Sequence, residues 1–187
     1  MQLFMDIVFV IAVGYYSYQY ILSLARMKKK IIFPAADEER AAIRKYPLKP
    51  LDFPANPKRK TGIIIYSFVL LVITAFFIIG KITKSVDWTF YPLLLLPLIN
   101  GENLLNIFSV QEDGILDGGR FVRWSRMSKY QFIPIDLNHK FYGYTDEVNA
   151  GYELKIKTKG SSVSCIVTSN EMREKLDLLL SEHIQQT

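Results

Sequence analysis

The chain is short of the residues that build disulfide frameworks and metal sites. Its 187 residues include one cysteine, Cys165, and two histidines, His139 and His183. A single cysteine excludes an internal disulfide, and these three side chains, far apart in the sequence, argue against a zinc site. Because Cys165 lies in an alternating, strand-like stretch, we interpret it as a small buried hydrophobic residue. We therefore expect no metal in this protein.

The sequence also lacks the short motifs that mark common enzyme sites. It contains no phosphate-cradling glycine loop, no Gly-x-Ser-x-Gly elbow and no His-Glu-x-x-His helix. The glycines of the Asp117–Gly119 stretch are not followed by a helical pattern that would present backbone amides to a phosphate. These absences favour a protein that is not an enzyme and carries no cofactor.

Charged side chains are nearly missing from three apolar runs, residues 3–24, 62–80 and 88–108. A helix rises about 1.5 Å per residue, so about 20 apolar residues cross a hydrocarbon core of ~30 Å. The first run has a signal peptide as its competing interpretation, but its positive charges follow it, which favours an uncleaved helix. The third run contains Pro92 and Pro97 and must carry polar residues into the bilayer to cross it. We favour three crossings.

Positive charge is concentrated between the first two runs. Residues 26–60 contain eleven basic and four acidic side chains, whereas residues 111–187 contain ten and eleven. An excess confined to one loop does not indicate a nucleic-acid partner, and it is typical of loops that stay in the cytoplasm. We therefore predict a multi-pass protein of the cell membrane, with its amino terminus outside and its carboxy-terminal domain in the cytoplasm.

Six of these basic residues flank the predicted membrane helices and are candidates for contact with anionic lipid headgroups. They are Lys28, Lys29, Lys30, Lys58, Arg59 and Lys60. Each basic side chain near an anionic surface contributes about 1 kcal/mol to membrane binding. Orientation of the helices is a sufficient explanation for the same clusters, and we favour it. Membrane lipids are the expected partners in both interpretations.

The remainder of this loop has two parts. Residues 35–45 combine good helix formers with early acidic and late basic side chains, and they predict one short surface helix. Residues 46–57 contain four prolines and predict an extended, stiff connector. A proline-recognising partner is the less favoured interpretation of that segment.

Polar residues gather near the end of the third apolar run. They are Asn100, Glu102, Asn103 and Asn106. On a helix, Glu102 and Asn106 share a face, as do Asn103 and Asn106. One hypothesis is an ion or proton path, or a hydrogen-bonded contact with another membrane helix. The favoured alternative is that these side chains solvate the helix end at the cytoplasmic interface.

After Ser109 the spacing of apolar residues changes from the helical period to a period of two. The predicted strands are residues 114–117, 120–124, 129–135, 152–158 and 162–168, with a further short one at 140–144. Residues 168–184 predict an amphipathic helix, in which Thr168 and Glu171 have the spacing of a capping box. Its apolar stripe consists of Met172, Leu176, Leu179, Leu180 and Ile184. Because the stripe must be buried, we expect the helix to close the sheet.

The predicted fold class is therefore an α+β membrane protein. Residues 1–108 form a transmembrane region of three helices with a basic, proline-rich cytoplasmic loop at 26–61. Residues 109–187 form a small antiparallel β-sheet or partial barrel capped by a C-terminal helix.

The stretch GILDGGRFVRWSRMSKYQF, residues 114–132, resembles a segment of bacterial membrane-anchored proteins with pleckstrin-homology-like (PH-like) domains, many of which belong to families of unknown function. The residues that carry the resemblance are Gly114, Ile115, Phe121, Val122, Trp124, Met127 and Tyr130. It covers residues 109–184 and implies a PH-like fold with a sensing, scaffolding or lipid-proximal role, without catalytic residues. We accordingly expect a non-enzymatic membrane protein whose module binds a protein partner or the membrane surface. The alternative is a small transporter, or a transporter subunit, that uses the site around Glu102.

Overall fold

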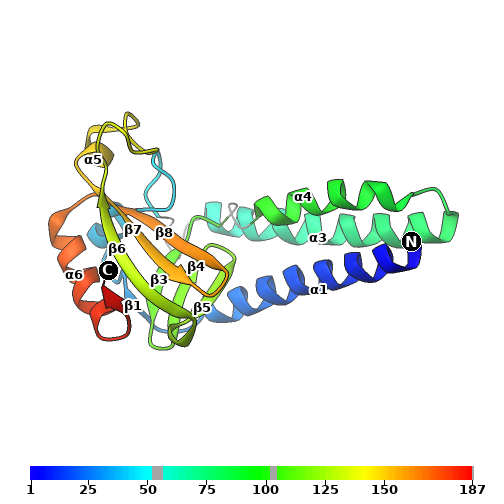
Figure 1. The fold of residues 1–187 in the computed structure, drawn as a ribbon, viewed down its shortest axis with the longest axis horizontal. Helices are drawn as coiled ribbons and strands as arrows, with labels where there is room; N and C mark the ends of the chain where they lie inside the picture. The colour runs from blue at the N-terminus through cyan, green and yellow to red at the C-terminus, as the bar shows by residue number, and fades with distance from the viewer. Residues whose placement is uncertain (52–56, 102–104, 187) are drawn as a thin grey trace. The chain divides into compact units, whose positions relative to one another are not determined.

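The chain divides into two compact units, each made of segments that are distant in the sequence (Figure 1). The structure, a computed structural model, describes residues 1–51, 57–101 and 105–186. The first unit contains Met1–Lys28, Ala55–Leu105 and Gly118–Arg120, and the second contains Lys29–Pro54, Asn106–Asp117 and Phe121–Thr187. The protein is thus of the α+β class, as predicted.

The first unit consists of helices. They are α1 (Gln2–Arg26), α3 (Pro57–Thr83), the short 3-10 helix η1 (Trp88–Phe90) and α4 (Tyr91–Gly101). By length and composition, two helical stretches are able to cross a membrane, Gln2–Arg26 and Thr61–Thr83, while the apolar stretch Trp88–Leu98 is shorter. Few side chains of the two long stretches are buried, which is compatible with helices that face lipid.

Aromatic side chains and hydroxyl groups join the helices of this unit. The Phe9 ring of α1 packs on Phe77 of α3 and Tyr91 of α4, with ring centroids 4.7 and 4.8 Å apart. Further along α1, the Tyr20 hydroxyl donates a hydrogen bond to the Ile63 carbonyl oxygen over 2.8 Å. Such contacts hold apolar helices together where the hydrophobic effect between them is weak.

The third apolar run is only partly helical. Helix α4 ends at Gly101, residues 105–107 belong to no helix or strand, and Phe108 begins strand β3. The prediction of one helix over 88–108 is therefore wrong at its carboxyl end. Phe108–Gln111 is buried at all four positions because it pairs with a neighbouring strand, and this non-local pairing overrides the helical spacing.

The second unit contains two small β-sheets. The first has the order β1–β3–β4–β5, and the second has the order β2–β8–β7–β6–β9. Their strands are β1 (Ile31–Phe33), β2 (Ile43–Arg44), β3 (Phe108–Gln111), β4 (Gly114–Asp117), β5 (Arg120–Arg123), β6 (Met127–Pro134), β7 (Tyr152–Thr158), β8 (Ser161–Val167) and β9 (Gln185–Gln186). The pairs β1–β3, β3–β4, β2–β8, β6–β7 and β7–β8 are antiparallel, and β6 and β9 are parallel. The short helices between them are η3 (Trp124–Arg126) and α5 (Asp146–Asn149).

The segment between the two long helices belongs to these sheets. It supplies β1, which pairs with β3, and β2, which pairs with β8. Between them lies helix α2 (Asp37–Ala42), shorter than the predicted 35–45. Phe33 and Ile43 are fully buried and Leu51 is 4% exposed, all in the main core. The expected short surface helix is thus confirmed in its central part, whereas the interpretation of residues 46–57 as an extended connector is wrong up to Leu51, which is buried in the core. Residues 52–56 lie outside the described part.

Helix α6 (Asn170–Ser181) closes the core as expected. Met172, Leu176 and Leu180 of the predicted stripe are buried against the strands. The cap, however, is Ser169, whose hydroxyl accepts a hydrogen bond from the Met172 amide over 3.3 Å. The Thr168 hydroxyl instead donates to the Ala42 carbonyl oxygen over 3.0 Å, so the predicted Thr168 capping box is wrong. The Thr168 hydroxyl is therefore not available as a cap. Its partner, Ala42, lies 126 positions earlier in the chain, so the sequence near Thr168 does not predict this bond.

Two further predictions concern the sheet. Cys165 is 1% exposed and belongs to the main core, which confirms its interpretation as a small buried residue. The short strand expected at 140–144 is wrong, since these residues form turns before α5.

Candidate functional site

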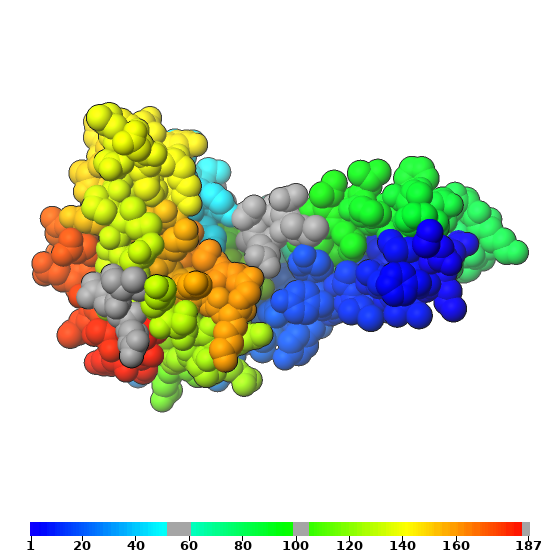
Figure 2. All heavy atoms as spheres, in the orientation of Figure 1, coloured from blue at the N-terminus to red at the C-terminus, as the bar shows by residue number. Residues whose placement is uncertain are grey.

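Polar side chains line a groove on the outer face of the second sheet. Its residues come from β6, β7 and β8, and its volume is about 480 Å³. They are Lys129, Tyr130, Gln131, Lys155, Lys157, Ser161 and Ser162, and we call this site the lysine groove. The hairpin that joins β7 and β8 is visible in orange on the face drawn in Figure 2.

The alternation of β7 explains why its lysines lie in the groove. Leu154 and Ile156 are fully buried in the core, so the residues between them, Lys155 and Lys157, point to the opposite face. The pairing of β6 with β7 then sets Lys129 opposite Lys157 and Gln131 opposite Lys155. Three lysines from two strands thus share one face.

These three lysines are not neutralised by the protein. Among the side chains that the structure describes, none forms an ion pair or a hydrogen bond with the ammonium group of Lys129, Lys155 or Lys157. Elsewhere in the same unit, basic side chains do have carboxylate partners: Lys45 pairs with Asp117, and Lys140 with Glu153 over 2.8 Å. The groove is therefore locally positive on a domain without net positive charge.

Tyr130 lies between Lys129 and Gln131 on β6 and is 1% exposed, because it pairs with the buried Ile156 and points to the core face of the sheet. Its hydroxyl donates a hydrogen bond to Asp177 Oδ1 of α6 over 2.8 Å. Burial, together with this carboxylate, raises the pKa of Tyr130 above its ordinary value. The phenol therefore stays protonated and attaches β6, the strand that carries Lys129, to α6.

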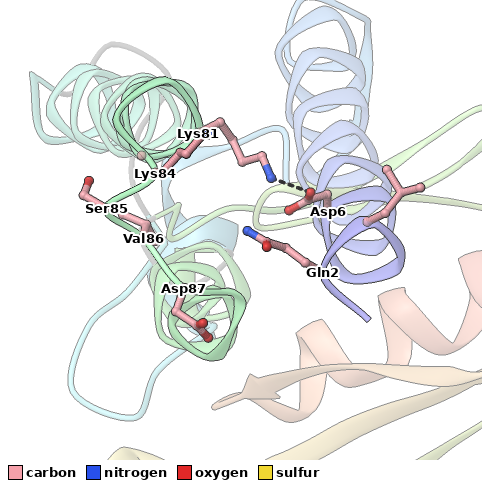
Figure 3. Close-up of a pocket in the computed structure, with 9 residues that line it drawn as sticks. Gln2, Asp6, Lys81, Lys84, Ser85, Val86 and Asp87 are labelled. Atoms are coloured by element: carbon pink, nitrogen blue, oxygen red, sulfur yellow. Dashed lines mark hydrogen bonds and ion pairs between the residues drawn. The ribbon is translucent and has the colours of Figure 1, made fainter.

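A second polar site lies in the first unit, at the end where α3 turns toward α4 (Figure 3). It is a pocket of about 570 Å³ lined by Gln2, Leu3, Asp6, Gly80, Lys81, Lys84, Ser85, Val86 and Asp87. Lys81 reaches from α3 to Asp6 of α1, with 2.5 Å between Nζ and Oδ2. The Tyr91 hydroxyl of α4 donates to the other oxygen of Asp6. One carboxylate thus joins three helices.

The Asp6 site is better suited to holding helices together than to binding a ligand. Its carboxylate already accepts from Lys81 and Tyr91, so both oxygens are engaged. Paired charges of this kind are the usual state of ionisable groups near membrane helices. The sequence around Asp6 gives no indication of its partners, because Lys81 and Tyr91 lie in other helices.

The polar residues predicted around Glu102 are not brought together as one described cluster. The side chains of Asn100, Glu102 and Asn103 lie outside the part that the structure describes. Asn106 lies beyond helix α4, is 8% exposed, and its side-chain amide donates to the Pro50 carbonyl oxygen over 2.7 Å. The shared helical face on which that grouping depended does not extend to Asn106, because the helix ends before it.

The predicted lipid contacts fall into two groups. Lys28, Lys29 and Lys30 are exposed directly after α1, and Lys29 lies 3.5 Å from Asp113 in a solvent-exposed ion pair. Lys58, Arg59 and Lys60 lie in the first turn of α3, and their side chains are outside the described part.

No metal site accompanies these features: the described residues contain no group of three or more His, Cys, Asp or Glu side chains able to hold a metal ion. The lysine groove was missed by the sequence analysis. The alternating spacing of Lys155 and Lys157 indicates that they share a face of one strand. The presence of Lys129 beside them depends on the register between β6 and β7, which the sequence does not show.

Comparison with known proteins adds no relative to these observations. No family model, no curated protein and no solved structure matches the chain.

Proposed function

We propose that this chain is a non-enzymatic protein of the cell membrane that crosses the bilayer three times and presents a PH-like binding module in the cytoplasm. The module would consist of residues 29–54 and 106–187, and it would bind a protein partner or the membrane surface. The observation that carries the proposal is the hydrogen-bonded pairing between these two parts of the chain.

Strand pairing requires that both parts lie on one side of a membrane. Strand β1 pairs with β3, and β2 pairs with β8, while Phe33 and Ile43 share a core with Phe108 and Val167. Backbone hydrogen bonds and a common core cannot form across a bilayer. The intervening residues 55–105 must therefore leave this side and return to it, if they enter the membrane at all.

Helix α3 is long enough for the outward path, and α4, with 11 residues, would supply the helical part of the return path. Helix α3 has 27 residues, about 40 Å at the helical rise, and residues 61–83 carry a mean hydropathy of 2.8. The chain then turns, and α4 packs back on α3 through Tyr91 and Phe77, whose ring centroids are 5.5 Å apart. With α1 as a further crossing, the count is odd and the amino terminus lies opposite the module.

The charge distribution supports the cytoplasmic side for the module. One basic group follows α1 and the other begins α3, so the two flank the loop part of the module in the sequence. Basic groups next to membrane helices usually remain in the cytoplasm. Two small sheets closed by a C-terminal helix also fit the plan that the resemblance to PH-like domains implies.

Labelling of single cysteines with a membrane-impermeant thiol reagent tests this topology. The wild-type chain is the control, since its Cys165 is buried. We expect Lys49→Cys and Leu137→Cys, both at exposed positions, to react only after the cells are permeabilised. We expect Gln2→Cys and Ser85→Cys to react on intact cells.

Each outcome bears on one step of the proposal. If Lys49→Cys and Leu137→Cys react from opposite sides, the strand pairing on which the module depends does not form in the membrane. If Ser85→Cys reacts from the same side as both, residues 55–105 make no crossing. If Gln2→Cys reacts only after permeabilisation while the other three variants react as expected, α1 does not cross the membrane.

A further inference from the structure

We infer that the lysine groove binds a phosphate-bearing anion through Lys129, Lys155 and Lys157. This inference names the ligand chemistry of the proposed binding module and rests on that binding role, but it does not depend on how often the chain crosses the membrane.

The first argument is the placement of like charges. Lys129 and Lys157 are direct cross-strand partners, and Lys155 follows Lys157 on the same face of β7. Like charges directly opposite each other destabilise a sheet. Departures from local stability rules are expected at functional sites, where a ligand compensates for them. A bound anion among the three ammonium groups would remove the repulsion.

The second argument is that the protein provides no anion of its own. The acidic residues nearest in the strands are engaged elsewhere: Glu153 of β7 is 3% exposed and lies 3.0 Å from His139 and 2.8 Å from Lys140. Asp177 accepts the Tyr130 hydroxyl. None of the carboxylates that the structure describes pairs with the three lysines, which leaves their charge available to an external anion.

The third argument is the set of donors and the size of the site. The three lysines, Gln131 and Ser162 are among the residues that line a volume of about 480 Å³, and each has a side chain able to donate a hydrogen bond. Phosphate offers several acceptor oxygens and up to two negative charges, and charge-assisted hydrogen bonds to it are stronger than neutral ones. Small-molecule sites commonly measure 300–1,000 Å³. A phosphate group with a small substituent fits this volume.

Two sources can supply that chemistry, a soluble phosphate ester and a phospholipid headgroup, and lysine footprinting distinguishes them. The full chain is placed in nanodiscs of phosphatidylcholine and acetylated with and without glycerol phosphate, at constant ionic strength set with chloride. A parallel sample uses nanodiscs that contain phosphatidylglycerol. Acetylation is measured at the three groove lysines and, as internal references, at the exposed Lys49 and Lys159.

We expect protection of the groove lysines, but not of the references, in at least one arm. Protection by glycerol phosphate alone identifies a soluble ligand, and protection by phosphatidylglycerol alone identifies a headgroup at the membrane surface. Equal acetylation of the groove lysines in all of these samples overturns the inference. Protection by an added acidic peptide alone would also overturn it, because the ligand would then be a protein and not a phosphate. Because the soluble arm requires no particular orientation in the membrane, its result is independent of the topology labelling.

A pair of double variants locates the site. In Lys155→Gln/Lys157→Gln, the ligand concentration that half-protects Lys129 should rise roughly 25-fold, since each lysine near an anion contributes a factor of about five. The control Lys49→Gln/Lys159→Gln changes the net charge equally and should shift it less than twofold. The reaction rate of the buried Cys165 reports that both variants are folded. Equal shifts in the two variants would mean that the anion senses only overall charge.

Discussion

The carboxylate of Glu39 pairs with the ammonium group of Lys175, 136 positions later in the chain. Its other oxygen accepts hydrogen bonds from the amides of Ala35 and Ala36, over 2.6 and 3.3 Å. Glu39 is 7% exposed, and it joins the start of α2 to the C-terminal helix α6. The segment between the two long helices is thereby attached to the module through side chains as well as through strand pairing.

Replacing Glu39 with alanine should therefore weaken the module. Two backbone amides would lose their acceptor and Lys175 its partner, at a cost of about 1–3 kcal/mol. The only cysteine of the chain, buried Cys165, provides the measurement, because it reacts with a thiol reagent when the module opens. The labelling rate should rise roughly 5- to 150-fold in Glu39→Ala. The adjacent, exposed Glu38→Ala should change it about twofold at most; similar rates in the two variants would contradict this role for Glu39.

The same carboxylate predicts a pH dependence. Burial opposes the ionisation of Glu39, but the hydrogen bonds from Lys175 and from the Ala35 and Ala36 amides outweigh it and lower its pKa below the ordinary 4.5. A lowered carboxyl pKa contributes stability that is complete above pH 4.5 and is lost as the pH falls through the lowered value. The stability difference between wild type and Glu39→Gln should therefore shrink below pH 4.5.

Labelling of Cys165 with a dipyridyl disulfide, which reacts with thiols in acid, measures this difference from pH 6 to pH 3. In Glu38→Gln, the exposed neighbour, the difference from wild type should stay near zero across this range. A gap between wild type and Glu39→Gln that is constant with pH would show that the charge of Glu39 is not what stabilises the module.

Strand β2 provides a further prediction. Ile43 is fully buried in the core and pairs with Val167 of β8. Ile43→Ala should cost about 2–5 kcal/mol, the usual loss for a buried isoleucine, and accelerate labelling of Cys165 at least 30-fold. Ile32→Ala in β1, where the side chain is 41% exposed, is the matched control and should have little effect. If both variants are equally mild, the loop segment is not part of the core.

Strands β4 to β8 were predictable from the sequence, but the very short β1 and β2 were not, for a physical reason. Strands β7 and β8 have seven residues each, enough for an alternating pattern that matches the predicted ranges within one position. Strands β1 and β2 have three and two residues, too few to show any period. Their place is decided by partners far along the chain, such as Val110 for Phe33 and Val167 for Ile43.

The candidate site was predictable to a similar extent. The pattern of β7 places Lys155 and Lys157 on the outer face, whereas the position of Lys129 opposite Lys157 depends on register between two strands. The same limit applies in the helices, because nothing near Asp6 in the sequence indicates Lys81 or Tyr91 as its partners.

The module is built from two segments, residues 29–54 and 106–187, that are separated in the sequence. A last prediction is that neither segment folds without the other. Residues 109–187 alone lack β1, β2 and the buried side chains of Phe33, Ile43 and Leu51. Edge strands and core would then be incomplete, so this fragment should not fold, and its Cys165 should react as fast as in denaturant.

A chimera that omits the membrane helices should restore folding. Because the Asn106 amide lies 2.7 Å from the Pro50 carbonyl oxygen, a short glycine–serine linker can join residues 29–54 to 106–187. In this soluble chain, Cys165 should be protected, and the Ile43→Ala substitution should expose it. Protection of Cys165 in fragment 109–187 by itself would instead mean that this fragment folds without strands β1 and β2. The pairing of these strands would then no longer require residues 29–54 and 106–187 to lie on one side of the membrane.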